Sequence, residues 1–259
     1  MSSNLDAFIH SSRPPPEPVA ISQEIRDRGS TFLGYIFRTA SPEDAQKVVT
    51  YVRNVMHASR RATHEISAWR CMLLKTGKSG LGGPDDFELR AGSDDDDEKY
   101  AGERVLKTMK AEGAMDAVVI ISRWYGGELL GPARFSHIET CTREVCKTFR
   151  QKEDMDECIT TLMSLDDILA TLRTELSSTL PPRPTEDTDQ NEASISTTVS
   201  RKTQDYTSLR DSLDLKKAKR LITARENSIK AVKVSLQKAK EKQDSRIEPH
   251  MLSASSDAV

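Results

Sequence analysis

The sequence has 259 residues, with 38 Lys and Arg against 40 Asp and Glu, so its net charge of −2 excludes a general attraction to nucleic acid. Its 36% hydrophobic and 30% charged content predicts a globular part joined to poorly packed segments. The N-terminus lacks a secretory signal pattern, and no run approaches the roughly 18 apolar residues of a membrane span. We therefore expect a cytoplasmic protein with no membrane contact.

Residues 1–24 are expected to form a flexible arm, and residues 25–150 to form one domain in which strands alternate with three helices. The expected strands lie at 32–37, 66–74 and 117–121, and the expected helices at 41–59, 100–113 and 131–149. Ser41 followed by Pro42 is typical of a helix start, and Gly113 is typical of a helix end. Strand 117–121 is apolar throughout, which predicts burial on both faces or at the centre of a sheet.

Residues 75–98 are rich in Gly, Pro and Asp and predict a long exposed loop, with a short extended piece at Phe87–Leu89. The loop ends in an acidic run, Asp94–Glu98. A solvated acidic loop is the simpler interpretation of this run. Cation binding is the alternative, but the run lacks the spaced ligands and the turn glycine of a calcium loop.

Residues 122–135, "SRWYGGELLGPARF", end a buried strand, turn on two glycines and begin a helix after Pro132. Gly126 and Gly127 permit a tight turn, which is the structural interpretation. The alternative is an anion site at the start of the following helix, where Arg134 and His137 lie and free N–H groups are expected.

The segments after residue 150 differ in composition from the domain. Residues 151–176 predict a short amphipathic helix, 177–205 a disordered linker, 206–244 a basic helix and 245–259 a disordered tail. From 210 to 246 there are twelve Lys and Arg against five Asp and Glu. The basic helix places these residues at heptad a and d positions: Leu215, Ala218, Ile222, Arg225, Ile229, Val232, Leu236 and Ala239. A solvated helix, a coiled coil through 206–243, and a nucleic-acid or membrane-surface contact all remain open.

No arrangement of residues predicts catalysis, a metal site or a cofactor. Cys141 has no base at a suitable spacing, and His57, His64 and His137 form no metal-binding pair. The four cysteines show no zinc spacing and are expected to be reduced thiols. We therefore expect a binding protein and not an enzyme.

Three motifs, "ATHEISAWR", "DDDDEKYAGERVL" and "SRWYGGELLGPARFSHI", occur in the order and spacing of the IMPACT family domain, which the chain resembles over about residues 28–149. Two positions depart from the family pattern, because Asp97 and Glu103 stand where glycine is common. The resemblance implies an α+β fold like the second domain of ribosomal protein S5, with a mixed sheet and helices against one side. Family members usually carry an N-terminal RWD domain, and we expect this chain to lack one.

The resemblance also implies a role in translation. Eukaryotic members compete for the ribosome-associated activator of the general-control kinase and so restrain phosphorylation of the initiation factor during amino-acid starvation. That activator, or another ribosome-associated factor, is therefore the expected protein partner. RNA or the ribosome itself is the alternative partner, contacted through a basic surface and the C-terminal helix, and self-association through 206–243 is a further expectation.

The residues expected to form the binding surface follow from the family motifs. They are His64, Arg70, Glu98, Arg123, Trp124, Gly126, Gly127, Arg134 and His137. We expect the His and Arg members to form one shared basic surface, with Glu98 orienting one of the arginines by a charge-assisted hydrogen bond.

Overall fold

The computed structural model describes residues 14–179 and 204–252, the last nine of these as backbone alone. The chain divides into two compact units, residues 1–150 and residues 151–259, which are described one after the other. Residues 1–13 of the predicted arm lie outside the described residues, as do most of the predicted linker and the end of the predicted tail. None of the helices in the described ranges is long and apolar enough to cross a lipid bilayer.

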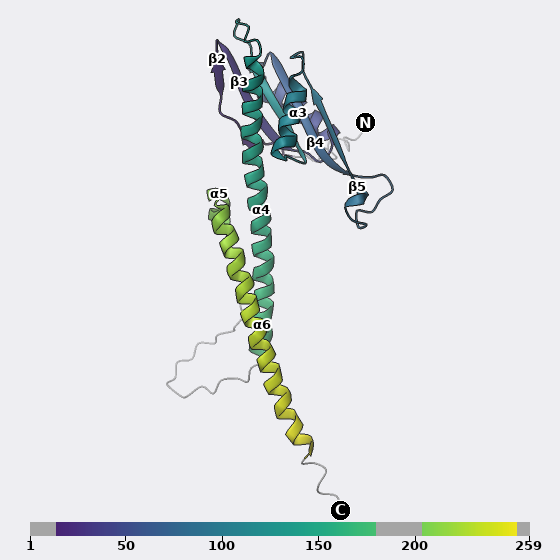
Figure 1. Cartoon of the computed structure of the whole chain (residues 1–259), viewed down its shortest axis with the longest axis vertical. Coiled ribbons are helices and arrows are strands. Elements are labelled where there is room, and N and C mark those ends of the chain that lie inside the picture. The colour runs from purple at the N-terminus through teal and green to yellow at the C-terminus, as the bar shows by residue number, and fades with distance from the viewer. Residues whose placement is uncertain (1–13, 180–203, 253–259) are drawn as a thin grey trace, which may run out of the picture. The chain divides into compact units, whose positions relative to one another are not determined.

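Among the described residues, the first unit contains six strands and the helices packed on them (Figure 1). The strands are β1 (Ala20–Ile21), β2 (Ile25–Asp27), β3 (Ser30–Arg38), β4 (His64–Leu74), β5 (Phe87–Asp94) and β6 (Ala117–Trp124). The helices are α2 (Pro42–Tyr51), its π-helical extension η1 (Val52–Met56), the 3-10 turn η2 (Pro84–Asp86), α3 (Ala101–Glu112) and the first part of α4 (Ala133–Thr179).

The predicted α+β class is confirmed, but two details of the sheet differ from the prediction. The strand order is β1-β3-β6-β4-β5, with β2 also paired to β3, and every described pair is antiparallel, so the sheet is not mixed. β1 lies inside the predicted flexible arm, because Ala20 pairs with Ile36 and the Val19 amide donates to the Ile36 carbonyl. The ordered domain therefore begins before residue 25.

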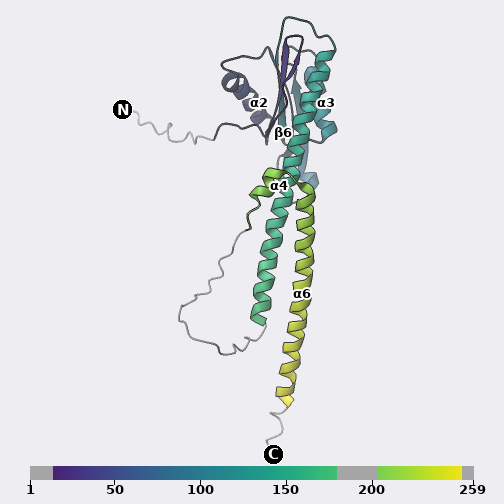
Figure 2. The same ribbon diagram turned by 90° about the vertical axis from the view of Figure 1, so that its left-hand side faces the viewer.

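Helices cover both faces of the sheet, and not one face as expected (Figure 2). On one face Phe32, Ile66 and Ile121 pack with α3 and α4. On the other face Tyr35 and Ile120 pack with α2. β6 lies between β3 and β4, and its apolar residues are buried on both faces, which explains the uninterrupted apolar run at 117–121.

The predicted helix boundaries in this unit follow from local capping. The Ser41 hydroxyl accepts a hydrogen bond from the Asp44 amide at 3.1 Å, and Pro42 is the first residue of α2. Gly113 ends α3 with a φ of 69°, a left-handed conformation that glycine adopts without steric cost. Both signals were local in the sequence, and both predictions are confirmed.

The predicted extended piece at Phe87–Leu89 is the start of β5, which continues to Asp94, so the predicted loop at 75–98 is wrong over residues 90–94. Leu74 pairs with Phe87 and Ser67 pairs with Asp94, so β5 follows almost the whole length of β4. Only two of its eight residues are even partly buried, so the apolar and polar residues that alternate from Phe87 to Ala91 do not mark a buried face.

The second unit consists of the rest of α4 (residues 151–179), α5 (Thr207–Ser212) and α6 (Leu215–Leu252). The expected end of a helix near Phe149 is wrong, because α4 continues without a break to Thr179 and includes the predicted short helix at 151–176. The predicted basic helix is instead two helices. They are separated at Leu213, which has a φ of 50°, and α6 extends into the predicted tail.

The apolar stripe of α6 packs against α4 of the same chain. Met155, Ile159 and Leu162 of α4 form a buried cluster with Leu209 and Ala218. Asp166 pairs with Arg225, and Glu175 pairs with Lys240, so the residue numbers of the partners rise together and the two helices run parallel. All eight predicted a and d residues of α6 are buried or half-buried. The apolar stripe of α6 is therefore covered by a helix of the same chain, while a coiled coil stays a prediction.

The one charged residue of the α6 stripe has a specific partner. Arg225 donates from Nε to the Asp166 carboxylate, which also accepts a hydrogen bond from the Tyr206 hydroxyl. A second guanidinium nitrogen of Arg225 donates to Gln204 at 2.8 Å. A polar pair within an apolar seam selects one register of the two helices, because any shift leaves the charges unpaired.

We expect Arg225→Ala to lower the free energy of unfolding of the helical unit by about 1 kcal/mol, since the pair is partly exposed. Both tryptophans, Trp69 and Trp124, lie in the first unit, so far-UV circular dichroism would report the loss while tryptophan fluorescence would not. Arg220→Ala, on the exposed face of α6, is the matched control and should change stability by less than about 0.5 kcal/mol. Equal unfolding midpoints for Arg225→Ala and Arg220→Ala would contradict a stabilising role for the pair of Arg225 and Asp166.

Candidate binding surface

A buried carboxylate, Glu98, is the centre of the candidate site. Its two oxygens are held by two arginines: Arg123 donates to Oε2, and Arg134 Nε lies 2.6 Å from Oε1. His64 Nε2 lies 3.7 Å from Oε2. The Glu98 and Arg123 side chains are only 7% and 5% exposed, so this is a buried charge network and not a solvent-facing ion pair.

Four separate elements bring this Glu98 cluster together. In the sheet, Arg123 of β6 lies between Phe32 of β3 and His64 of β4, because all three share one row of the strand register. Arg134 comes from the first turn of α4, and Glu98 from the turn that precedes α3. His64 Nδ1 carries a proton, because it donates to the Asp96 carbonyl at 2.7 Å and a carbonyl can only accept.

The acidic run at 94–98 is ordered, so the expected solvated loop is wrong. Asp95 accepts hydrogen bonds from the Tyr100 and Gly102 amides at 2.9 and 2.7 Å, which satisfies free N–H groups at the start of α3. Asp96 accepts from the Glu65 amide at 2.6 Å and pairs with Arg53 at 2.7 Å. The carboxylates that could have held a cation are thus used to attach this turn to the sheet and to α3.

Asp97 and Glu103, the two departures from the family pattern, occupy different environments. Asp97 has a φ of 65°, a left-handed conformation in which glycine is favoured, and this explains why glycine is common there. Glu103 is exposed in the first turn of α3. A carboxylate at that position interacts favourably with the helix dipole.

His137 lies on the same side of the sheet as the Glu98 cluster but has its own acidic partner. Its Nε2 is 2.8 Å from Asp27 Oδ2, and its ring packs on Phe32 with centroids 5.2 Å apart. The Arg28 guanidinium first, and then His137, hold the pKa of Asp27 down at about 2. His137 therefore already has a carboxylate partner outside the Glu98 cluster.

Arg70 and Trp124 do not belong to the cluster. Arg70 lies at the opposite end of α3, where its guanidinium donates to the Ala114 carbonyl at 2.8 Å and closes the C-terminal end of that helix. Trp124 donates to the Arg60 carbonyl at 3.2 Å and its ring packs on His57, on the face covered by α2. The predicted residues therefore do not form one shared basic surface, since Arg123 and Arg134 share the Glu98 carboxylate and Arg70 donates to a backbone carbonyl elsewhere.

The two adjacent glycines of the 125–131 loop, Gly126 and Gly127, have different structural roles. The Gly126 backbone crosses Gly29 so closely that an added Cβ would lie 1.9 Å from the Gly29 carbonyl carbon. Gly127 has open space around it but a φ of 93°. The first glycine is required by contact and the second by backbone conformation, so both support the structural interpretation of this turn.

A second buried polar network, on the α2 face, was missed by sequence reasoning. The Tyr35 hydroxyl lies 3.0 Å from His57 Nε2, and His57 Nδ1 lies 2.8 Å from Glu65 Oε1. Burial raises the pKa of Tyr35, and the Glu65 carboxylate adds to that effect. Arg53 joins this network to Asp96, so it shares a support with the turn that carries Glu98.

Exposed aromatic and aliphatic side chains surround the Glu98 cluster and were also missed. Tyr125 is 44% exposed and Leu129 is 85% exposed on the loop after β6, and Tyr100 is 58% exposed two residues after Glu98. The Arg123 guanidinium lies 5.6 Å from the centre of the Tyr125 ring. Tyr125 was part of the noted motif, but its exposure depends on how the loop is held.

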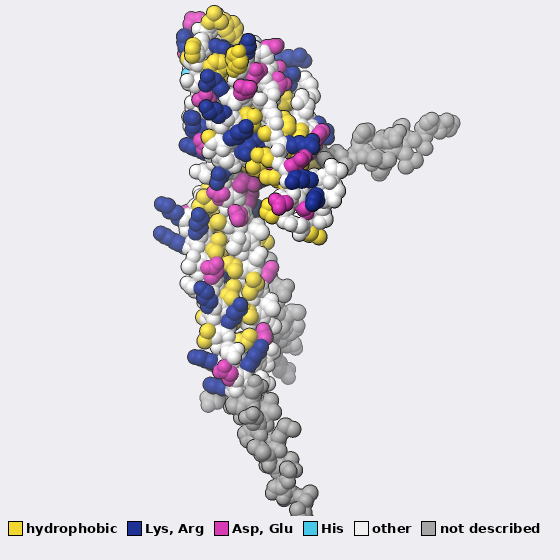
Figure 3. Space-filling model, turned by 45° about the vertical axis from the view of Figure 1, so that its right-hand side comes forward, with side chains coloured by type: hydrophobic (Ala, Val, Ile, Leu, Met, Phe, Trp, Pro, Cys, Tyr) yellow, Lys and Arg dark blue, Asp and Glu magenta, His cyan; other side chains and the backbone are white. Residues whose placement is uncertain are grey.

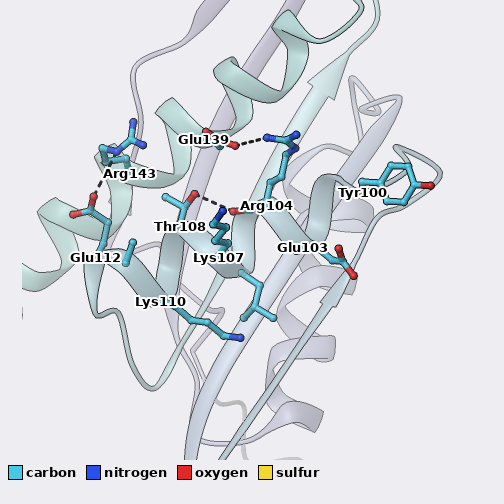
Figure 4. Close-up of a pocket in the computed structure, with 11 residues that line it drawn as sticks. Tyr100, Glu103, Arg104, Lys107, Thr108, Lys110, Glu112, Glu139 and Arg143 are labelled. Atoms are coloured by element: carbon cyan, nitrogen blue, oxygen red, sulfur yellow. Dashed lines mark hydrogen bonds and ion pairs between the residues drawn. The ribbon is translucent and has the colours of Figure 1, made fainter.

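A groove of about 700 Å³ lies between α3 and α4 within the first unit (Figure 4). Its walls carry charges of both signs, several of them paired: Arg104 with Glu139 at 2.8 Å and Arg143 with Glu112 at 3.5 Å. Lys107 and Lys110 also line it. The mixed charge gives the groove no preference for an anion.

All four cysteines are buried, and burial raises the pKa of the Cys146 thiol to about 12 and also raises the pKa of Cys71 and Cys141. Within the described ranges no group of three or more His, Cys, Asp or Glu side chains is placed to hold a metal ion.

These features define an α+β domain whose loops are fixed by buried Arg–Glu and His–Glu networks and carry exposed aromatic side chains. Residues 28–146 match the Impact N-terminal domain family. Protein IMPACT of Xenopus laevis is 37% identical over 131 residues, which cover 49% of this chain and 38% of the frog protein. The IMPACT homolog of Saccharomyces cerevisiae is 35% identical over 130 residues, or 50% of this chain and 46% of the yeast protein. These matches support the IMPACT family.

Two solved structures were also similar. The two-domain translational regulator Yih1 is 32% identical, with a TM-score of 0.32, over 48% of this chain and 44% of that one. A hypothetical protein is 26% identical, with a TM-score of 0.38, over 52% of this chain and 59% of that one. The chain spans less than half the length of the curated relatives named above.

Proposed function

We propose that this chain is a cytoplasmic, translation-linked regulator of the IMPACT type that acts by binding other proteins. Its proposed partner is the ribosome-associated activator of the general-control kinase, and its proposed effect is to modulate initiation-factor phosphorylation in amino-acid starvation. The match of residues 28–146 to the Impact N-terminal domain carries this proposal. The lack of an RWD domain stays a prediction, because the matched relatives are more than twice as long as the aligned segment.

A binding role, and not catalysis, is proposed from the chemistry of the domain. Burial raises the pKa of the Cys71, Cys141 and Cys146 thiols, which favours the protonated form, a poor nucleophile. Tyr125, Leu129 and Tyr100 are exposed on loops that the Glu98 cluster holds in place. Aromatic side chains displayed on a rigid support are typical of the residues that dominate protein interfaces.

A second candidate function is contact with ribosomal RNA through α6. Because the apolar stripe of α6 packs on α4, its basic side chains are left on the outside. They are Lys216, Lys217, Lys219, Arg220, Lys230, Lys233 and Lys238, all exposed. In Figure 3 Lys and Arg side chains project along the helices of the second unit, while both signs alternate over the first unit. Such a contact would weaken steeply with salt.

We expect Tyr125→Ala combined with Leu129→Ala to reduce capture of the kinase activator from starved cells about tenfold or more, because exposed anchor residues dominate interface energies. The measurement is a pull-down with the tagged full-length chain at low and high salt. Changing Lys216, Lys219, Lys230 and Lys233 to Gln is the matched variant, and it should leave that capture unchanged. Loss of ribosomes with the Gln variant alone would favour the second function.

A further inference from the structure

The β4–β5 hairpin carries an exposed apolar patch at the end where its loop joins the two strands. Met72, Leu74, Phe87 and Leu89 are 41%, 47%, 37% and 46% exposed. Met72 pairs with Leu89 and Leu74 pairs with Phe87, so two cross-strand pairs lie side by side on one face of the hairpin. Adjacent exposed apolar pairs are uncommon on a surface that has no partner.

The loop that closes this hairpin is ordered and supports the patch. Asp86 is 5% exposed and accepts hydrogen bonds from the Gly80 and Gly82 amides at 3.1 and 2.9 Å. A Cβ on Gly80 would lie 3.5 Å from both Leu74 and Phe87, so the loop backbone packs on this apolar pair. The patch therefore has one defined shape, which lowers the entropy cost of binding.

β5 is also the edge strand of the sheet, as Figure 1 shows. Among the described residues it pairs with β4 alone, so one side of its backbone is open. Edge strands are commonly protected by proline, lysine or a bulge. β5, with the sequence FELRAGSD, contains neither proline nor lysine, and its pairing with β4 is continuous from Phe87 to Asp94.

We propose that β5 pairs antiparallel with β5 of a second copy of this chain, with Leu89 facing Leu89 on the two-fold axis. In this register Glu88 of each copy lies opposite Arg90 of the other, so two pairs of opposite charges form on one face. On the other face the two Leu89 side chains meet, and Phe87 of each copy lies opposite Ala91. The strand is complementary to itself in both charge and polarity.

The neighbouring registers are disfavoured by the same residues. Moving the axis to residue 88 places Glu88 opposite Glu88, and moving it to residue 90 places Arg90 opposite Arg90. Like charges directly opposite one another destabilise a strand pair. In the single chain Glu88 and Arg90 pair with each other at 2.7 Å, and their side chains stay 38% and 59% exposed and accessible to a second copy.

Charge exchange tests this register in the full-length chain. E88R and R90E should each weaken self-association about tenfold, because each places like charges opposite one another twice. The double variant E88R/R90E should restore it, and an equimolar mixture of the two single variants should associate as well as the unmodified chain. Sedimentation velocity over a range of concentrations measures each case. Both residues are exposed, and circular dichroism would show that the variants fold.

A cysteine at the axis gives a second, independent readout. Oxidation of the L89C variant should link two copies by a disulfide, whereas A91C should link them far less, because residue 91 faces residue 87 across the axis. The four native cysteines are buried and give little background. Two results would overturn the proposal. One is a chain that is monomeric at every concentration. The other is self-association that none of the charge variants changes, as is expected for pairing through α6.

Discussion

Replacing Glu98 by alanine is expected to destabilise the first unit by about 3–5 kcal/mol. The substitution leaves the Arg123 guanidinium, only 5% exposed, without its carboxylate, and removes the ion pair of Arg134 as well. Breaking a buried ion pair from one side costs more than the pair itself contributes, because an uncompensated charge stays buried. The measurement is a urea denaturation curve followed by tryptophan fluorescence.

The matched control for Glu98 is Glu103→Ala, which removes an exposed carboxylate in the same segment. It should change the free energy of unfolding by less than about 0.5 kcal/mol. Replacing Glu98, Arg123 and Arg134 together with apolar residues should recover much of the loss, since no charge is then left unpaired. If Glu98→Ala were as stable as Glu103→Ala, the buried network would not support the loops that carry Tyr100 and Tyr125.

Replacing Gly126 by alanine should cost about 3 kcal/mol or more. The added methyl group would lie 1.9 Å from the Gly29 carbonyl carbon and 2.4 Å from the Ser30 nitrogen, and both are backbone atoms. The loop must therefore move away from the β2–β3 turn, which also weakens the hydrogen bond from the Gly126 amide to the Ser30 hydroxyl. Thermal and urea unfolding would measure the loss.

Gly127→Ala separates this contact effect from backbone conformation. The space around Gly127 is open, so only its φ of 93° opposes a side chain, at a cost of about 1–2 kcal/mol. Gly126→Ala should therefore lower the free energy of unfolding more than Gly127→Ala does. An equal loss at both positions would mean that the crossing of Gly126 and Gly29 is looser than the structure shows.

Local signals in the sequence were sufficient for several elements. The helix at 42–51 was predictable because Ser41, Pro42 and the apolar spacing lie within one short segment. The central position of β6 followed from its apolar run, because both faces of that strand are buried. The stripe of α6 was predictable for the same reason, as its a and d residues repeat along a single helix.

Other elements had little local signal. β5 was predicted only at its start, as an extended piece at Phe87–Leu89, because the strand is largely exposed and its full length depends on pairing with β4. The continuation of α4 beyond residue 149 was hidden because its buried stripe changes partner, from the sheet in the first unit to α5 and α6 in the second. A change of partner alters the composition of the stripe without breaking the helix.

The sequence by itself determined the α+β class, the capped helices, the central strand and the family motifs, because each depends on neighbouring residues. The tertiary structure alone decided what the charged residues of those motifs do. His64, Glu98, Arg123 and Arg134 are distant in sequence and meet only through the strand register and the ends of two helices. Once buried together, the two arginines share the single Glu98 carboxylate, so residues predicted to form an open basic surface form an internal ion-pair network instead.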